Sequence, residues 1–201
     1  MPNWLTCPLL LVLGACQASG TTAQLSDGVA PQLVVTTLGD SLRDLRADFN
    51  RNRDCVRLIA LLSPNCGPCA WGAQAVRGAV LAAFPDAPLR VSIVWIEMVP
   101  VDDGESIAEA SSLFTDPRVR HYHDVERRAG RAFAEGLLPT SVAWDVYLLY
   151  EPGLLWIDRP PMPTYWSHQL GRIRTDHYHP GDQLPAKLSE GTGMLLAING
   201  L

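Results

Sequence analysis

The most informative segment of the chain is LIALLSPNCGPCAWGAQAV, residues 58–76. An apolar run comes first, and two cysteines, Cys66 and Cys69, follow with only the dipeptide Gly67-Pro68 between them. A pair with this spacing can be a redox centre, part of a metal site or a structural disulfide. The rest of the chain has to distinguish these three possibilities.

Length and composition fit an ordinary globular protein. The chain has 201 residues, of which 47% are hydrophobic and 18% are charged, and this suits one domain with additional segments. The formal net charge of -5 gives no support to a nucleic-acid partner.

The N-terminus has the layout of an export signal. The apolar run in CPLLLVLGACQASGTTAQ, residues 7–24, is shorter than the roughly 20 residues that span a bilayer, and small and polar residues follow it. LGAC, residues 13–16, resembles a bacterial lipobox, although no Lys or Arg precedes it. We expect a signal peptide over residues 1–16, a lipid on Cys16 and a flexible tether over residues 17–32. The alternative is a frayed apolar end of a cytosolic protein.

Export would leave an odd number of cysteines in the mature chain. Cys7 would be removed with the signal and Cys16 would carry lipid, so Cys55, Cys66 and Cys69 remain. Cys66 and Cys69 are paired by their spacing. We therefore expect Cys55 to be a small buried residue at the start of a strand.

Helical and strand-like patterns alternate along the chain and predict a mixed sheet with helices on both faces. The predicted strands cover residues 32–40, 55–63, 89–99, 141–150 and 154–158, the last two as a hairpin. The predicted helices cover residues 41–52, 66–84, 106–114, 116–136 and 163–173.

The two cysteines open one of these helices, with Asn65 as a possible cap. A helix N-terminus presents free backbone N–H groups and a partial positive charge, which stabilise a thiolate. Thiol pKa values fall from about 8.5 to between ~3.5 and ~7.5 in such places. We therefore predict that Cys66 is the nucleophile and that Cys69, one turn on, resolves the mixed disulfide. Gly67 and Pro68 suit the first turn, where a missing proline N–H costs nothing.

Two other interpretations of the pair were weighed. A structural zinc site needs two further ligands, and the chain has no second Cys-x-x-Cys. His121 and His123 fall in a predicted helix and are expected on its surface, and His177 and His179 in a polar loop that could form a weak metal site. A static disulfide across two residues is strained and easily reduced. Redox chemistry is thus favoured, and no metal or other cofactor is expected.

The CGPC motif between an apolar strand and a helix resembles the active site of the thioredoxin superfamily. The resemblance covers about residues 32–174, mostly through the order of elements. It implies a thioredoxin-like three-layer α/β/α sandwich with a mixed central sheet and an insertion before a C-terminal β-hairpin. It places the domain at residues 33–174 and leaves residues 175–201 as a C-terminal extension. With the lipobox, the chain looks most like membrane-tethered thioredoxin-like proteins of bacterial envelopes.

Three positions depart from the family pattern. The usual tryptophan before the first cysteine is Asn65, and the buried acid of the preceding strand is replaced by Ala60. Glu97 could serve as the proton acceptor instead, or could lie in solvent. The resemblance also implies a cis-proline whose backbone pairs with substrate. Pro139 is the candidate, although counting back from the hairpin turn favours the position of Trp144.

An insertion is expected at residues 99–128, beyond the carboxyl end of a strand. In open α/β folds this end borders the active site, so the insertion could shape a substrate groove. The alternative for its Asp102 and Asp103 is a solvated loop.

The predicted function is that of an envelope thiol–disulfide oxidoreductase, on the periplasmic side of the membrane. Its partners would be a cysteine-containing protein or small thiol, a redox protein that resets the disulfide, and the membrane through the lipid anchor. Gly67, Pro68 and Pro139 would bind substrate. The alternatives are a copper- or zinc-handling module that uses the cysteine pair and a histidine, and a thioredoxin-shaped interaction protein without turnover.

Overall fold

The computed structural model describes Met1 and residues 33–201. The expected signal peptide, the lipidated Cys16 and the tether lie outside the described residues. Residues 33–201 form one compact unit. Within this part of the chain, no helix has the length and apolar character needed to cross a bilayer.

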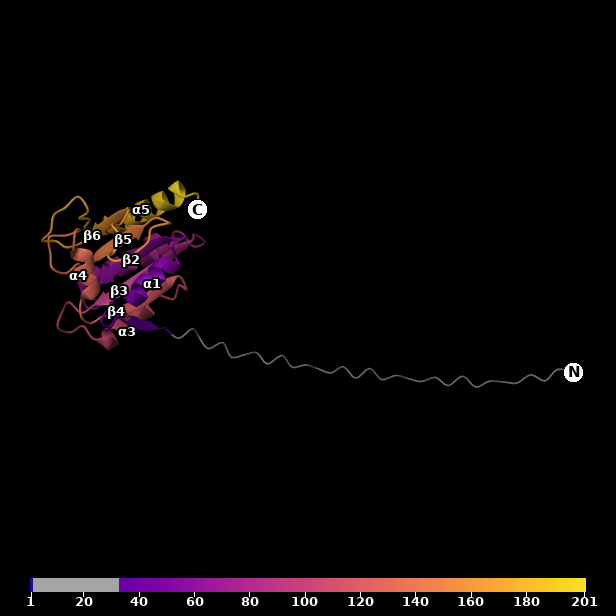
Figure 1. The fold of residues 1–201 in the computed structure, drawn as a ribbon, viewed down its shortest axis with the longest axis horizontal. Helices are drawn as coiled ribbons and strands as arrows, with labels where there is room; N and C mark the ends of the chain where they lie inside the picture. Colours follow the sequence, from indigo (N-terminus) through magenta and orange to yellow (C-terminus); the bar gives the residue numbers. More distant parts are fainter. Residues whose placement is uncertain (2–32) are drawn as a thin grey trace. The chain divides into compact units, whose positions relative to one another are not determined.

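A six-stranded sheet forms the centre of this unit (Figure 1). Four neighbouring strands are parallel, β5 runs antiparallel to β2, and β6 runs antiparallel to β5. In spatial order the strands are β1 (Val35–Thr37), β4 (Val119–Asp124), β3 (Leu89–Ile96), β2 (Val56–Leu62), β5 (Val146–Tyr150) and β6 (Tyr165–His168). Every residue of β2 is buried, as expected for a central strand covered on both faces.

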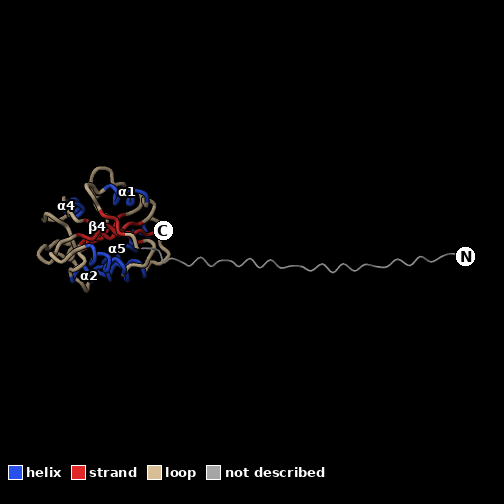
Figure 2. The backbone as a smooth tube through the Cα atoms, turned by 90° about the horizontal axis from the view of Figure 1, so that it is seen from below, coloured by secondary structure: helices blue, strands red, loops and turns tan. Residues whose placement is uncertain are grey.

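Helices cover both faces of the sheet, so the predicted three-layer sandwich is confirmed. Figure 2 shows α1 and α4 on one side of the strands and α2 and α5 on the other. The helices are α1 (Arg43–Arg51), α2 (Gly67–Ala75), α3 (Gly104–Ser112), α4 (Arg128–Ala134) and α5 (Leu184–Ile198), and a π-helical segment, η1 (Val76–Ala82), continues α2. Alternate residues of β2 enter two separate cores: Leu58 and Ala60 pack on the α2 side, and Ile59 and Leu61 on the α1 side.

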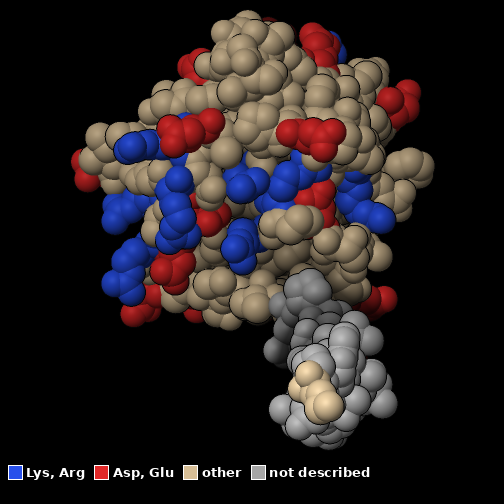
Figure 3. Space-filling view, turned by 90° about the vertical axis from the view of Figure 1, so that its right-hand side faces the viewer, with Lys and Arg blue, Asp and Glu red and all other residues tan. Residues whose placement is uncertain are grey.

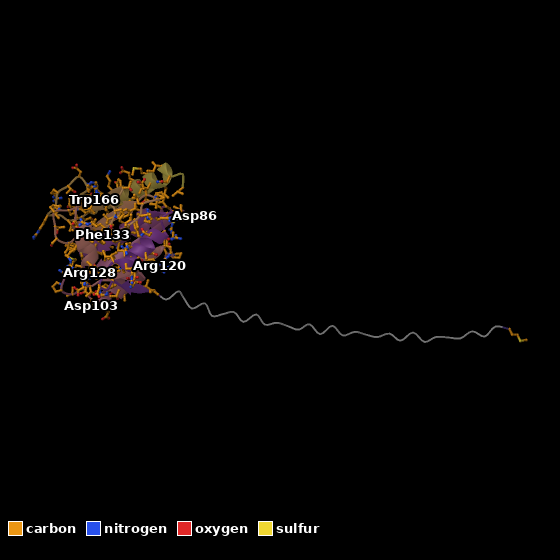
Figure 4. The ribbon with its side chains drawn as sticks, in the orientation of Figure 1. Asp86, Asp103, Arg120, Arg128, Phe133 and Trp166 are labelled. Atoms are coloured by element: carbon orange, nitrogen blue, oxygen red, sulfur yellow. The ribbon has the colours of Figure 1, made fainter. Side chains whose placement is uncertain are left out.

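One face of the molecule carries charged side chains of both signs (Figure 3). Basic and acidic side chains are interleaved on the face shown in Figure 3. Trp166 of β6 lies toward one edge of the sheet, whereas Asp103, just ahead of α3, lies toward the other (Figure 4). The reactive cysteines follow β2, near the middle of this arrangement.

One predicted helix contains a strand. Part of residues 116–136 forms β4, which lies between β1 and β3. His121 and His123 therefore share one face of a strand, and His121 is buried instead of exposed. Parallel pairing on both sides satisfies the backbone of β4, and this tertiary pairing outweighs the helical pattern of the sequence.

The hairpin after β5 also differs from the prediction. The partner of β5 is β6, within the predicted helix 163–173, and not residues 154–158. Prolines at 160, 161 and 163 remove backbone donors from the segment before β6, which disfavours a strand there. Residues 175–201, predicted as an extension, contain α5, which packs on η1, β6 and α2 within the same compact unit.

Candidate active site

Cys66 caps the helix that follows it. Its backbone is extended, with φ -92° and ψ 120°, and α2 begins at Gly67. The Cys69 backbone N–H donates to Cys66 Sγ at 3.4 Å. Pro68 occupies the first turn, where its missing N–H costs nothing. The expected cap by Asn65 is thus wrong: the cysteine sulfur takes this place itself.

The two thiols have opposite acidities. A hydrogen bond from the Cys69 thiol lowers the pKa of Cys66; burial opposes this shift, and the Cys69 backbone N–H adds to it. Burial raises the pKa of Cys69 well above its ordinary value, and its hydrogen bond to Cys66 and the charge of Asp145 raise it further. Cys66 is 8% exposed and Cys69 only 1%. Both are free thiols, and Cys66 is the more acidic of the two.

A buried carboxylate holds the loop before Cys66. Asp102 accepts hydrogen bonds from Ser63 Oγ at 2.7 Å, from the backbone N–H and the side-chain amide of Asn65 at 3.1 Å each, and from the backbone N–H groups of Met98 and Val99 at 2.8 and 3.0 Å. Asp102 is only 8% exposed, so the alternative of a solvated loop is wrong for this residue. Asn65, in place of the family tryptophan, serves as an anchor of the loop.

A second buried carboxylate lies on the opposite side of the motif. Asp145 Oδ1 accepts hydrogen bonds from the Tyr147 hydroxyl at 2.8 Å and from Gln169 Nε2 at 3.0 Å. The same Gln169 nitrogen lies 3.1 Å from the carbonyl oxygen of Pro68, between the two cysteines. Asp145 is 2% exposed and has a positive φ of 54°, a conformation that Asp and Asn tolerate better than most residues.

A glycine in α2 admits this polar cluster beneath the helix. A Cβ atom on Gly72 would lie 1.4 Å from the Tyr147 hydroxyl oxygen, so no larger residue fits without displacing the tyrosine. The tyrosine is fully buried on the α2 side of the sheet. Its hydroxyl therefore lies under the first two turns of the helix that Cys66 caps.

An open groove lies beside the CGPC motif. It has a volume of about 790 Å³ and is lined by Gly67 and Pro68 from the motif, Trp71 from α2, and Gln169 and Tyr178 from the segment after β6. Trp71 is 67% exposed. The groove places a mainly apolar surface next to Gly67 and Pro68, the two residues between the cysteines.

The other predicted site residues lie elsewhere. Glu97 follows β3 and pairs with His123 Nε2 at 2.8 Å. Pro139 lies in the loop between α4 and β5, and no peptide bond among residues 33–201 is cis, so the expectation of a cis-proline is wrong. Trp144 and Asp145 directly precede β5. Counting back from the hairpin turn had placed the family's proline near Trp144.

Sequence reasoning missed Asp145, Tyr147 and Gln169. The available signal for Asp145 was its position directly ahead of the apolar run VYLLY, which forms a buried strand. Gln169 had no recognisable signal, because its segment was predicted to be helical.

The described residues offer a metal ion few ligands. Between residues 33 and 201, no three His, Cys, Asp or Glu side chains converge on one point. His177 stacks on Trp166, and its Nδ1 lies 3.0 Å from the Trp166 carbonyl oxygen. His177 therefore belongs to the packing around β6.

Comparison with known proteins found no family model and no curated protein that matches the chain. Two solved structures are similar. One is a thioredoxin-like protein in its oxidised form, with TM-score 0.48 and 16% identity over 72% of this chain and 80% of that one. The other is a secreted Mycobacterium tuberculosis disulfide oxidoreductase homologous to E. coli DsbE, with TM-score 0.41 and 12% identity over 72% and 85% of the respective chains.

The assignment of the fold follows from the arrangement of the strands around the motif. The central strand β2 leads into α2, which Cys66 of the CGPC motif caps. On one side β2 pairs with the parallel strand β3, and on the other with β5, which begins an antiparallel hairpin beside the cysteines. One additional strand, β4, belongs to the segment between β3 and β5 that the sequence analysis treated as an insertion. The fold of residues 33–201 is thioredoxin-like.

Proposed function

We propose that the protein is a thiol–disulfide oxidoreductase in which Cys66 is the attacking thiol and Cys69 the resolving thiol. The observation that carries this proposal is the sulfur cap of α2. Cys66 Sγ receives the Cys69 backbone N–H at 3.4 Å, and its pKa is lowered, mainly by the hydrogen bond from the Cys69 thiol. The second thiol lies one turn along the same helix and is almost fully buried.

The proposed exchange takes two steps. The Cys66 thiolate attacks a substrate disulfide, forms a mixed disulfide and releases one substrate thiolate. Cys69 then loses its proton and attacks Cys66 Sγ, which forms the Cys66–Cys69 disulfide and releases the second substrate thiolate. The substrate gains two electrons and the enzyme loses two. The reverse reaction oxidises a substrate dithiol through the same intermediates.

The groove next to the motif is the proposed binding surface for substrate, and its proposed occupant is a polypeptide segment next to the substrate cysteine. Gly67 and Pro68 form the wall nearest the sulfur, and the exposed ring of Trp71 offers an apolar contact. A small thiol needs only Cys66, whereas a polypeptide would also use the groove. Pro139 does not line the groove, and its role in substrate binding remains a prediction.

The proposed location is the bacterial envelope, on its extracytoplasmic side, with the chain tethered through a lipid on Cys16. The sequence of residues 7–24 supports this part of the proposal. A redox protein of the same compartment would have to reset the cysteine pair after each turnover. Replacement Cys16→Ser should move the protein from the membrane fraction to the soluble fraction, and an unchanged distribution would argue against the anchor.

The decisive experiment is to trap the mixed disulfide. Without the resolving thiol, Cys69→Ser should accumulate a covalent adduct with a peptide disulfide, which mass spectrometry detects and dithiothreitol releases. Cys66→Ser is the matched control and should form no adduct. A wild-type protein that binds the peptide but neither forms an adduct nor reduces it would instead support the interaction protein without turnover.

A further inference from the structure

Resolution of the mixed disulfide needs a proton acceptor. Cys69 is 1% exposed and is held as a thiol, so its proton has to leave before its sulfur can attack. The position from which the family supplies an acid is Ala60, in the apolar interior of β2. Glu97 pairs with His123 beyond the end of β3. The chain therefore needs another buried group near the cysteines.

The neighbouring strand supplies such a group. Ala60 of β2 pairs with Tyr147 of β5, and Asp145 lies two residues before this tyrosine, just ahead of the strand. Asp145 lies outside the strand and has a left-handed backbone, so its contact with Tyr147, which is buried on the α2 side, is what places its carboxyl group there. The Tyr147 hydroxyl donates to Asp145 Oδ1 at 2.8 Å. The hairpin strand thus places a carboxyl group and a phenol where β2 itself is apolar.

Two contacts connect this cluster to the cysteines. Gln169 Nε2 lies within hydrogen-bond distance of both Asp145 Oδ1, at 3.0 Å, and the Pro68 carbonyl oxygen, at 3.1 Å. The Tyr147 hydroxyl lies under Gly72, one turn beyond Cys69. The carboxyl group therefore belongs to a hydrogen-bonded network that contacts the first turns of α2, and it lies close enough for its charge to raise the pKa of Cys69.

We propose that Asp145 is the buried group that takes up the Cys69 proton when this sulfur attacks the mixed disulfide at Cys66. This inference rests on the proposed thiol–disulfide exchange. The Cys69 S–H bond breaks, its proton passes to the Asp145 carboxylate, the Cys69–Cys66 bond forms, and the substrate sulfur leaves with the bonding electron pair. In the reverse reaction, Asp145 returns the proton to Cys69 as its sulfur leaves.

The electrostatics around Asp145 support this role. The titratable groups facing Asp145 are Cys66 and Cys69 from α2 and Tyr147 from β5, and Gln169 is uncharged. Burial raises the pKa of Asp145, although hydrogen bonds from Tyr147 and Gln169 oppose the shift. A carboxyl group whose pKa is raised toward neutrality exchanges protons more readily with a thiol than an ordinary surface aspartate does.

Asp145→Asn is the informative variant. Asparagine has nearly the same shape and tolerates the positive φ, but it carries no charge and accepts no proton. In a Cys66→Ser background, the pKa of Cys69, measured by alkylation rate against pH, should fall by about one unit when the neighbouring charge is removed. In the chain with both cysteines, resolution of a preformed mixed disulfide at pH 7 should slow by at least about 10-fold, because loss of a proton acceptor outweighs the more acidic thiol.

Glu97→Gln is the matched control, because Glu97 was the acid expected from the sequence. It should change neither the Cys69 pKa nor the resolution rate. Resolution in the wild type should depend on pH through the ionisation of Asp145, and this inflection should disappear only in Asp145→Asn. An unchanged Cys69 pKa and pH profile in Asp145→Asn, or an equal loss in Glu97→Gln, would overturn the assignment.

Failure of the exchange itself has a different signature. A wild-type protein that forms no mixed disulfide with peptide disulfides contradicts the proposed function, whereas the Cys69 pKa in the Cys66→Ser background tests Asp145 without any turnover. If Asp145→Asn does not fold, Tyr147→Phe provides the test. Loss of the phenol donor should move the Asp145 inflection to higher pH. An inflection that does not move would contradict the proposal.

Discussion

Two buried aspartates flank the CGPC motif, and they differ in the number of hydrogen-bond donors around them. Asp102 lies beside the loop that precedes Cys66 and accepts five hydrogen bonds from backbone and side-chain groups. Asp145 lies under the helix that follows Cys66 and accepts two, from Tyr147 and Gln169. Both residues are buried, but Asp145, at 2% exposed, is shielded more completely than Asp102, at 8%.

The difference in donors, together with the deeper burial of Asp145, gives the two pKa shifts opposite signs. Burial raises the pKa of both groups, but at Asp102 the hydrogen bonds from Val99, Ser63 and Met98 outweigh it and the net shift is downward. At Asp145 burial prevails and the net shift is upward. Asp102 is therefore the more acidic of the two groups and holds the loop as a carboxylate, whereas Asp145 binds a proton more readily. The number of donors and the depth of burial together distinguish the two carboxyl groups.

The largest expected effect comes from closing the space around the Asp145 cluster. Gly72→Ala would place a Cβ 1.4 Å from the Tyr147 hydroxyl, so the helix and the strand would have to separate. Overpacking of this kind costs about 3 kcal/mol or more in the free energy of unfolding, which urea denaturation measures.

Gly78→Ala is the matched control in the continuation of the same helix. Nothing lies within 4 Å of a Cβ at this position, so the replacement should be neutral or stabilising by up to ~1 kcal/mol. Equal stabilities for Gly72→Ala and Gly78→Ala would show that Tyr147 does not lie as close under α2 as described.

The next largest effect is expected at Asp102, the carboxylate that holds the loop before Cys66. Asp102→Asn keeps the shape of the side chain but removes its charge and turns an N–H₂ group toward N–H donors. Loss of hydrogen bonds to a buried charged group should lower the free energy of unfolding by roughly 2–3 kcal/mol at pH 7. The pKa of Asp102 is lowered in the folded state, so its contribution is present above the unfolded value of about 3.9 and is lost as the pH falls through the folded pKa. The wild type and Asp102→Asn should therefore converge in stability in acid.

The neighbouring Asp103 is a control with the same chemistry. It caps α3 by accepting the Ser106 backbone N–H at 2.8 Å, and asparagine caps a helix about as well as aspartate. Asp103→Asn should thus leave the free energy of unfolding unchanged. A loss as large as that of Asp102→Asn would refute the distinction between the anchor and its neighbour.

The elements next to the motif were predictable because local patterns determine them. The continuous apolar run before Cys66 predicts the central strand. The small residues and the proline that follow Cys66 predict the start of the helix. The mixed sheet, its helical layers and the adjacency of the two cysteines all followed from this segment and the alternation of elements. A sulfur that caps its own helix was not expected, because Asn65 is the stronger N-cap residue by its side-chain chemistry.

Strands β4 and β6 and the buried acids were not predictable, since they depend on contacts distant in sequence. His121 and Tyr122 lie in a strand because β1 and β3 pair with it, and residues 165–168 form β6 because β5 is available. Asp102 differs from the exposed Asp103 through backbone donors from Met98 and Val99 and through donors from Ser63 and Asn65 across the fold. No pattern within a short window of sequence contains this information.

Replacement of one side chain in the groove beside the motif tests the proposed preference for polypeptide substrates. Trp71→Ala removes an exposed ring from the groove wall without touching either aspartate. We expect kcat/KM for a peptide disulfide to fall about 10-fold, through KM, because contact with a large aromatic side chain is lost. Reaction with a small disulfide and the pKa of Cys66 should not change. Ile157→Ala, which removes another exposed apolar side chain outside the groove, is the control, and an equal loss in both variants would contradict the role of Trp71.

The smallest expected effect has the opposite sign and separates the two aspartates most directly. The pKa of Asp145 is raised in the folded state, so its contribution to stability is complete below the unfolded value of about 3.9 and is lost as the pH rises through the folded pKa. Asp145→Asn should therefore be as stable as the wild type at pH 7, or more stable by up to ~1 kcal/mol, with a flatter dependence of stability on pH above 4. Urea denaturation between pH 4 and 8 measures this difference. A loss at neutral pH as large as that of Asp102→Asn would mean that Asp145 is a second anchor, and would remove the stability argument for its uptake of the Cys69 proton.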